Sequence, residues 1–171
     1  VRNLYAEHIS KTNTGTYNAL IGSANKAAVI ENVHVTDIEL AISNRVGGII
    51  GDLYDAGRIT NCSVISILLL DTLTSNSDLR IGGIAGSLTD SIIENSYVQD
   101  LNFETEFSSI TGIGGLVGQA NNSIIQNAYI TGTIKANNQN VGGIVGYAPN
   151  SINLSNAYSN VNIHTTQGNV G

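Results

Sequence analysis

Cysteine, proline, aromatic residues and charge are all scarce in this 171-residue chain, and the scarcity excludes several classes of protein. A single cysteine, Cys62, cannot form an internal disulfide. Lysine and arginine total 7 against 13 acidic residues, and a net charge of −6 disfavours a nucleic-acid partner, which requires basic patches. Charged residues are only 12% of the chain, about half the usual share of a globular domain.

Signals for membrane insertion, metal binding and catalysis are also missing. No apolar run approaches the roughly 18 to 20 residues of a membrane span, so we expect no membrane insertion. The sequence contains no His-Glu-x-x-His zinc signature. The histidines are His8, His34 and His164, which occupy different places in the repeat described below. Cys62 resembles a buried small hydrophobic residue rather than a nucleophile. We therefore predict no catalytic residue, no metal and no cofactor.

What the chain does contain is a glycine-rich phrase that recurs. Val46-Gly47-Gly48-Ile49-Ile50-Gly51 returns at 81–86, 113–118 and 141–146, and 17–22 is a worn copy. The repeated glycines are Gly47, Gly48, Gly51, Gly82, Gly83, Gly86, Gly114, Gly115, Gly118, Gly142, Gly143 and Gly146. The phrase is a poor match to the phosphate-binding pattern Gly-x-Gly-x-x-Gly. Val117 occupies the position of the last glycine of that pattern, and no helix signal follows. Close backbone packing or a left-handed corner explains the glycines better.

An asparagine column accompanies the glycine phrase. Its members are Asn3, Asn32, Asn61, Asn95, Asn127 and Asn156, at steps of 29, 29, 34, 32 and 29 residues. A period near 30 residues is typical of stacked repeats. Asparagine at one place in every coil can pass side-chain hydrogen bonds along a ladder and tolerates the left-handed conformation of a corner.

The repeats predict an all-β fold. Glycine and asparagine are poor helix formers, and the apolar runs are short and bounded by Gly, Asn, Ser and Asp. We predict a right-handed parallel β-helix of about five to six coils with three short strands per coil. In the fourth coil the strands would be 141–146, 152–158 and 161–165. Because the chain starts at Val1 and ends inside a phrase, we expect 1–171 to be one solenoid fragment cut at both ends from a longer chain with flanking domains.

A tyrosine stripe is the first candidate surface. The residues two places after each asparagine are Tyr5, His34, Ser63, Tyr97, Tyr129 and Tyr158. Tyr97, Tyr129 and Tyr158 are candidates for contact with a glycan or a partner protein, where aromatic residues are enriched. The favoured alternative is an aromatic ladder that packs on itself or beneath a neighbouring segment.

Two insertions are the second candidate surface, because extra residues in repeat proteins often lie on the binding side. They fall around 70–78 and 102–109. The second carries Phe103, Glu104, Glu106 and Phe107, whose side chains we expect to be exposed as a contact patch. The favoured alternative is a loop without a function, or one that covers the wall of the solenoid. Ser123 is expected in an exposed turn.

The two phrases together resemble the GLUG-type repeat, in which Gly-Gly-Leu-Val-Gly is followed by Asn-Ser-Tyr. Gly114-Gly115-Leu116-Val117-Gly118 with Asn127-Ala128-Tyr129 is the nearest copy. This repeat occurs in the N-terminal part of secreted immunoglobulin A protease-type zinc metallopeptidases of Gram-positive bacteria, and in other bacterial surface proteins and adhesins. The resemblance implies a parallel β-helix, an extracellular location that is secreted or cell-wall attached, and a catalytic zinc domain elsewhere in the parent.

Three functions follow as hypotheses. The first is a non-catalytic module of a secreted or wall-attached bacterial zinc metalloprotease, acting as a spacer and as a recognition surface for a host protein such as immunoglobulin. The second is an adhesin module that binds host protein or glycan. The third, an independent carbohydrate-active enzyme, is disfavoured because Asp52, Asp90 and Asp100 fall in different registers.

Overall fold

The computed structural model describes residues 1–12, 15–71, 78–107, 110–137 and 140–166, and these form strands, turns and bends without a helix. The strands are β1 (Arg2–Lys11), β2 (Tyr17–Asn18), β3 (Ile21–Ala24), β4 (Val29–Ala41), β5 (Arg45–Gly47), β6 (Ile50–Leu53), β7 (Arg58–Thr60), β8 (Ser63–Leu70), β9 (Leu79–Gly82), β10 (Ala85–Thr89), β11 (Ile92–Thr105), β12 (Ile110–Gly114), β13 (Val117–Asn121), β14 (Ser123–Ala136), β15 (Val141–Gly142), β16 (Val145–Tyr147) and β17 (Ile152–Thr165). The all-β prediction is confirmed.

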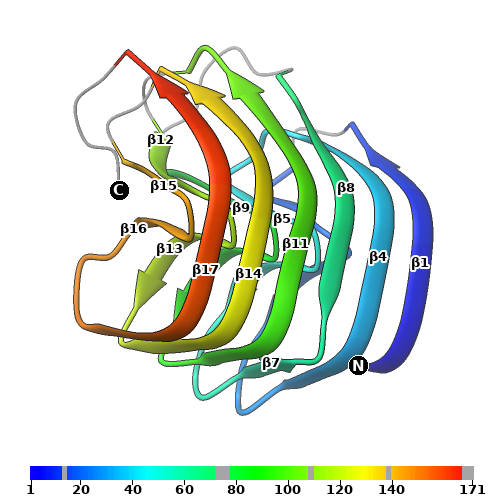
Figure 1. The fold of residues 1–171 in the computed structure, drawn as a ribbon. Coiled ribbons are helices and arrows are strands. Elements are labelled where there is room, and N and C mark those ends of the chain that lie inside the picture. Colours follow the sequence, from blue (N-terminus) through cyan, green and yellow to red (C-terminus); the bar gives the residue numbers. More distant parts are fainter. Residues whose placement is uncertain (13–14, 72–77, 108–109, 138–139, 167–171) are drawn as a thin grey trace.

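Three parallel sheets run the length of the molecule. Sheet A contains the long strands in the order β1-β4-β7-β11-β14-β17, with β8 continuing β7 and pairing with β4 and β11. Sheet B has the order β15-β12-β9-β5-β2, and sheet C has the order β16-β13-β10-β6-β3. Each coil therefore contributes one strand, or one broken strand, to every sheet. In Figure 1 the strands of sheet A run upward in front and successive coils lie further to the left, so the solenoid is right-handed, as predicted.

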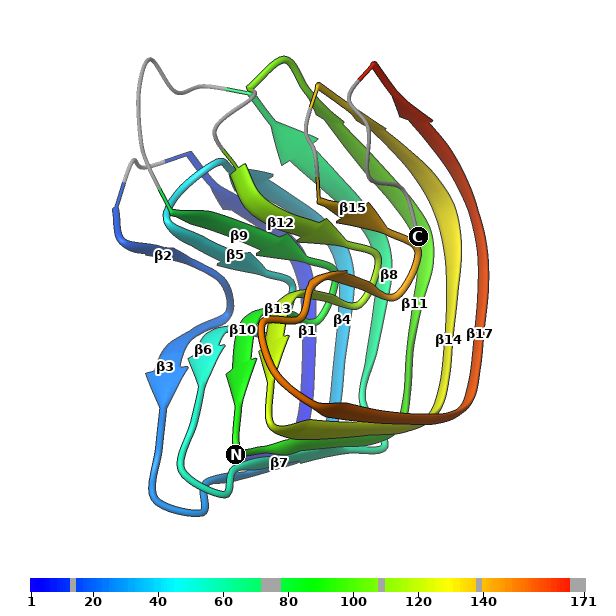
Figure 2. The ribbon, with the colours of Figure 1, turned by 90° about the vertical axis from the view of Figure 1, so that its left-hand side faces the viewer.

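The glycine phrase forms a corner between two strands. Sheet B ends at Gly47, the chain turns through Gly48 and Ile49, and sheet C begins at Ile50. Figure 2 shows this corner bending the outline of each coil inward. A Cβ on Gly48 would lie 2.5 Å from the carbonyl oxygen of Gly83 in the next coil. Close approach between coils therefore requires glycine here. None of the twelve repeated glycines has a left-handed backbone, so the alternative explanation for them is wrong.

The predicted strand boundaries are wrong in two places. In the fourth coil the stretch 141–146 is divided between β15 and β16, which lie in different sheets. The stretches 152–158 and 161–165 are instead one curved strand, β17. The apolar pattern gives no sign of the corner, because the corner residues Ile49, Ile84 and Leu116 are fully buried, like the strand residues beside them.

The asparagine column supplies both properties expected of it. All six asparagines have left-handed backbone, with φ from 49° to 54°. Asn32 donates its side-chain amide to Oδ1 of Asn3 at 3.0 Å, and Asn156 donates to Asn127 at 3.1 Å. In the described part of the chain no such bond joins Asn61 to Asn32 or Asn95, so the ladder has a gap where sheet A is broken between β7 and β8. The column thus bends every long strand at the same height.

Next to left-handed residues, buried hydroxyl groups and the thiol of Cys62 accept hydrogen bonds from backbone N–H groups of the adjacent coil. Cys62 follows a left-handed asparagine, and its Sγ accepts the backbone N–H of Val33 at 3.4 Å. Its own N–H donates to Oγ of Ser96 at 3.1 Å. Ser123 follows left-handed Asn122, and its Oγ accepts the N–H of Ser91 at 3.2 Å. The expectation that Ser123 is exposed is wrong: its exposure is 2%.

Candidate functional site on the outer face of sheet A

The outer face of sheet A carries the tyrosine stripe in strict register. Tyr97 pairs with Tyr129, and Tyr129 pairs with Tyr158, on adjacent strands. The rings of Tyr97 and Tyr129 stack with centroids 4.7 Å apart and planes 6° from parallel. The stripe is therefore an aromatic ladder at this point, as expected. Tyr129 is 39% exposed and Tyr158 63% exposed, so the ladder also presents ring surface to solvent.

At the other end of the stripe the aromatic contacts are less regular. The Tyr5 ring lies 5.0 Å from the His34 ring at a tilt of 33°. Nδ1 of His34 lies 2.8 Å from Oγ of Ser63, which is buried. Burial raises the pKa of Tyr129, with a smaller contribution from the neighbouring Tyr97, so the Tyr129 hydroxyl remains a protonated donor at neutral pH.

A second left-handed column lies on the same face, five places after the asparagines. Its members are His8, Asp37, Ser66 and Asp100, with φ from 53° to 59°. The bend that they make is not continued in β14. Gln99 and Asp100 of β11 face a single residue of β14, and the register between the two strands shifts between Val98 and Leu101. The N–H of Asp100 donates to Oγ1 of Thr131 at 3.3 Å across this irregularity.

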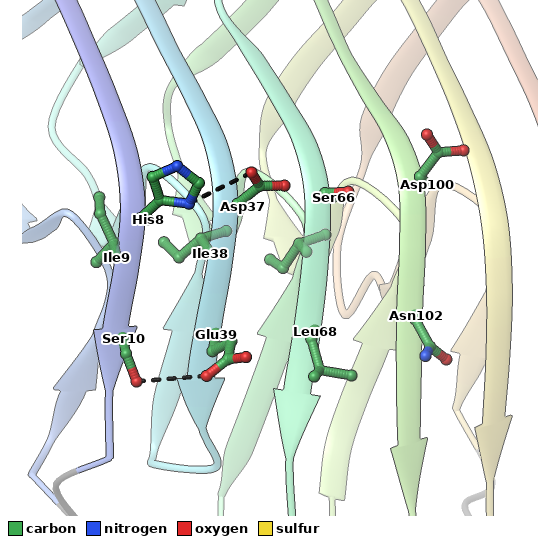
Figure 3. Close-up of a pocket in the computed structure, with 11 residues that line it drawn as sticks. His8, Ile9, Ser10, Asp37, Ile38, Glu39, Ser66, Leu68, Asp100 and Asn102 are labelled. Carbon is green, nitrogen blue, oxygen red and sulfur yellow. Dashed lines mark hydrogen bonds and ion pairs between the residues drawn. The ribbon is translucent and has the colours of Figure 1, made fainter.

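This column borders a depression of approximately 580 Å³ on strands β1, β4, β8 and β11 (Figure 3). Its lining residues are His8, Ile9, Ser10, Asp37, Ile38, Glu39, Ser66, Ile67, Leu68, Asp100 and Asn102. Nδ1 of His8 lies 3.5 Å from Oδ2 of Asp37, and Ser10 donates to Glu39 at 3.5 Å. The depression thus offers carboxylates, hydroxyls and an amide on a shallow surface, which are groups suited to hydrogen bonding with a ligand.

The second insertion occupies a different part of the face. Phe103 lies inside β11 and is fully buried, so its predicted exposure is wrong. The cause is strand alternation: Phe103 points into the core while Glu104 points out. Phe107 is half-buried and packs against the core. Both insertions lie partly outside the described residues, the first at 72–77 and the second at 108–109. Asp71 of the first insertion accepts the backbone N–H of Glu106 at 3.1 Å.

The exposed acids of this insertion do line a smaller depression of approximately 390 Å³ with Lys135 and His164. Lys135 pairs with Glu104 at 3.5 Å, and Asn137 donates to Glu106 at 3.1 Å. Both acids are therefore engaged with the neighbouring coil.

Cys62 is not placed to act as a nucleophile. Burial raises the pKa of the Cys62 thiol, and its Sγ lies 3.2 Å from the carbonyl oxygen of Thr60, so the thiol stays protonated and enclosed. No group of three or more His, Cys, Asp or Glu side chains that would suit a metal ion occurs in the described parts of the chain. Among those residues there is also no helix of the length and apolarity that a membrane span needs.

The best-formed ion-pair cluster lies on sheet B, away from this face. Asp78 contacts Arg45 at 3.0 Å and Arg80 at 2.9 Å. Partial burial opposes ionisation of Asp78, but the two arginines outweigh it and hold the pKa of the carboxyl below its usual value. Thr111 also donates to Asp78 at 3.1 Å. The cluster ties three coils together and has a structural role.

Sequence reasoning missed the column of His8, Asp37, Ser66 and Asp100. The available signal was the constant offset of five residues from each asparagine, at which His, Asp, Ser, Asp and then Gly132 occur.

The prediction that the three histidines share no column is confirmed: His8 is level with Asp37, His34 with Tyr5, and His164 with Lys135. Asp100, however, shares a register with Asp37, two coils away.

Comparison with known proteins identifies the repeat. Residues 109–135 match the family model described as the GLUG motif. The matched segment contains β12 and β13 with their glycine corner and most of β14 with its asparagine and tyrosine, which is close to one complete coil. No match was found among curated proteins or among solved structures. This coil, repeated along three parallel sheets, makes the chain a β-solenoid that carries the GLUG repeat.

Proposed function

We propose that this chain is a non-catalytic solenoid module of an extracellular bacterial protein, and that the outer face of sheet A recognises the partner. The observation that carries the proposal is the placement of the exposed tyrosine ladder beside the depression bordered by His8 and Asp100 on one face. Tyrosine gives large contact area for little loss of conformational freedom, and stacking fixes the rings before a partner arrives.

The solenoid also suits a spacer. Each coil adds about one strand spacing, roughly 4.8 Å, along the axis, and every coil is hydrogen-bonded to the next in all three sheets. A module of this kind holds its neighbours at a set separation while presenting the face laterally. On the resemblance of the repeat, the parent is a secreted or wall-attached zinc metalloprotease, and the partner is its host-protein substrate, such as immunoglobulin.

An adhesin is the second candidate, and one observation favours it. Beyond the tyrosines, the outer face over β14 and β17 is built from amide and hydroxyl side chains with few charges. These are Gln126, Thr131, Thr133, Ser155, Asn160 and Asn162. Such groups pair readily with sugar hydroxyls, so this candidate predicts a glycan ligand.

Binding of the 171-residue chain to purified immunoglobulin A and to a panel of host glycans tests the recognition role. Replacing Tyr129 and Tyr158 together with alanine is expected to weaken binding at least about tenfold, as for exposed aromatic contacts. Tyr147→Ala is the matched control, because Tyr147 is a similarly exposed tyrosine on sheet C. Equal loss in the double variant and the control, with both chains folded by circular dichroism, contradicts the assignment of the face.

Assays of proteolysis and of adherence on the parent protein distinguish a protease from an adhesin. A protease parent cleaves its substrate in a zinc-dependent manner, and deleting residues 1–171 raises KM for the protein substrate more than for a short peptide. An adhesin parent shows no proteolysis and loses only adherence when the module is removed.

A further inference from the structure

The asparagine ladder is interrupted at the third coil, inside the array of repeats. Within the described residues the side chain of Asn61 makes no hydrogen bond, although Asn32 and Asn95 on the adjacent coils both belong to the ladder. The third coil has a neighbour on each side, because β7 and β8 pair with β4 and with β11 (Figure 1). The interruption is therefore a property of this coil and not of an end of the array.

The direction of the ladder leaves one donor and one acceptor unused beside this coil. Asn127 donates to Oδ1 of Asn95, and Nδ2 of Asn95 has no partner in the described chain. Asn32 donates to Oδ1 of Asn3, and its own Oδ1 is likewise unused. Ladder amides repeat at one strand spacing, about 4.8 Å. Asn32 and Asn95 are two spacings apart, so an amide placed between them can bond to both.

The tyrosine stripe is interrupted at the same coil. Ser63 takes the position that Tyr97 and Tyr129 fill in the next two coils. Tyr129 stacks on one face of the Tyr97 ring, and among the described residues no aromatic ring stacks on the other face. On the far side of Ser63, Nδ1 of His34 lies 2.8 Å from the Ser63 hydroxyl oxygen. The third coil thus lacks an amide bond in one column and a ring in the column two residues further on.

The groups beside this double gap are polar. Oγ1 of Thr60 donates to Oε1 of Glu94 at 3.2 Å, and Arg58 donates to the same oxygen at 2.5 Å. Arg58 and Asn61 are exposed. Aromatic and aliphatic anchors of protein partners usually enter well-packed, desolvated pockets. Exposed amide, hydroxyl and guanidinium groups suit a ligand with many hydroxyl groups better than such an anchor.

We propose that the third coil is a subsite for an N-acetylhexosamine residue of a glycan. The carbonyl oxygen of the acetamido group accepts from Nδ2 of Asn95, and its N–H donates to Oδ1 of Asn32. The sugar ring lies above Ser63, with its C–H groups against the unstacked face of Tyr97, because the face of an aromatic ring carries partial negative charge. The two columns are at most about 7 Å apart along the strand, and an acetamido group bonded directly to the sugar ring reaches from one to the other. This inference rests on the proposed function, since the subsite lies on the face assigned there to recognition.

Matched pairs of sugars test the subsite. N-acetylglucosamine and N-acetylgalactosamine are titrated into the nitrogen-15-labelled chain beside glucose and galactose, which lack the acetamido group. The acetylated sugars are expected to bind at least about tenfold more tightly, because only they make the two amide hydrogen bonds. The largest chemical-shift changes are expected at the side-chain amides of Asn61 and Asn95. Equal affinity within each pair, or no binding of the acetylated sugars, overturns the proposal.

Variants that keep the ladder bonds test the residues. Asn95→Asp keeps the oxygen that accepts from Asn127 and removes the unused donor, so N-acetylglucosamine is expected to bind at least about tenfold more weakly. Asn3→Asp is the matched control, because Asn3 also accepts from the next coil, at Asn32, and lies away from the gap. Its affinity should be unchanged. Ser63→Tyr fills the missing ring position and is expected to abolish binding, while circular dichroism shows that the chain remains folded.

The outcomes distinguish this subsite from the face as a whole. If replacing Tyr129 and Tyr158 with alanine weakens binding of a glycan or of immunoglobulin A, but Asn95→Asp and Ser63→Tyr do not, the subsite is wrong and the proposed function stands. If a tyrosine-containing peptide, and neither acetylated sugar, shifts the side-chain amides of Asn61 and Asn95, the third coil recognises a protein segment. That result also overturns the proposal.

Discussion

Asn127 donates its side-chain amide to Oδ1 of Asn95 across 2.9 Å, and both residues have left-handed backbone, with φ of 52° and 49°. One residue type thus meets two requirements at once. It permits a bend in the long strand that other side chains resist, and it bonds the bend of one coil to the bend of the next. The recurrence of asparagine is explained by this combination.

Substitutions at Asn127 separate the two requirements. Asn127→Leu loses the ladder bonds and also strains the left-handed backbone, so it is expected to destabilise the fold by roughly 1 to 3 kcal/mol. Asn127→Gly keeps the backbone conformation and loses only the amide, so a smaller loss is expected. Urea unfolding of both variants gives the comparison. Equal losses would show that the backbone bend contributes nothing.

Ser123→Ala is expected to destabilise the fold by about 1 to 3 kcal/mol, because it leaves the buried N–H of Ser91 without its acceptor. Ser155 is exposed on β17, and Ser155→Ala is expected to stay within about 0.5 kcal/mol. Thermal unfolding of the two variants measures the difference. A neutral Ser123→Ala would mean that this hydrogen bond is replaced by water.

Phe103→Ala is expected to reduce the free energy of unfolding by about 3 to 5 kcal/mol, since the ring is fully buried and its removal leaves a cavity. The exposed neighbour Asn102 provides the control, and Asn102→Ala should have little effect. If Phe103→Ala left stability unchanged, the burial of this ring in β11 would be wrong.

Cys62 is expected to be unreactive toward thiol reagents at pH 8 while the chain is folded. Burial raises the pKa of the thiol, and only the thiolate reacts at an appreciable rate. Labelling should be at least about 100-fold slower than in the unfolded chain, because it requires opening of the core. Rapid labelling of the native chain would contradict the enclosed position of Cys62.

The sequence was sufficient for the architecture because its strongest signals are periodic. The glycine corner and the asparagine column each impose a local backbone requirement, and repetition at nearly constant spacing leaves stacking as the arrangement that satisfies all copies. The tyrosine ladder followed from the same register.

Orientation of single side chains was harder to predict. Phe103 and Glu104 alternate across the wall, and no repeated phrase marks which of them faces inward. The second bend was missed because its position is filled by three different residue types, in His8, Asp37, Ser66 and Asp100. Ser123 looked like a turn residue, although its hydroxyl is buried as an acceptor for the N–H of Ser91 in the preceding coil.

The distance between Tyr5 and Tyr158 tests the stacked coil most directly. These residues are linked by five successive pairings, through His34, Ser63, Tyr97 and Tyr129. Spin labels at Tyr5→Cys and Tyr158→Cys, diluted with unlabelled chain to suppress contacts between copies, report the separation by pulsed electron paramagnetic resonance. One coil per strand spacing predicts a single distribution centred at about 24 Å. A centre beyond about 35 Å, or no defined maximum, would contradict the continuous stack of coils.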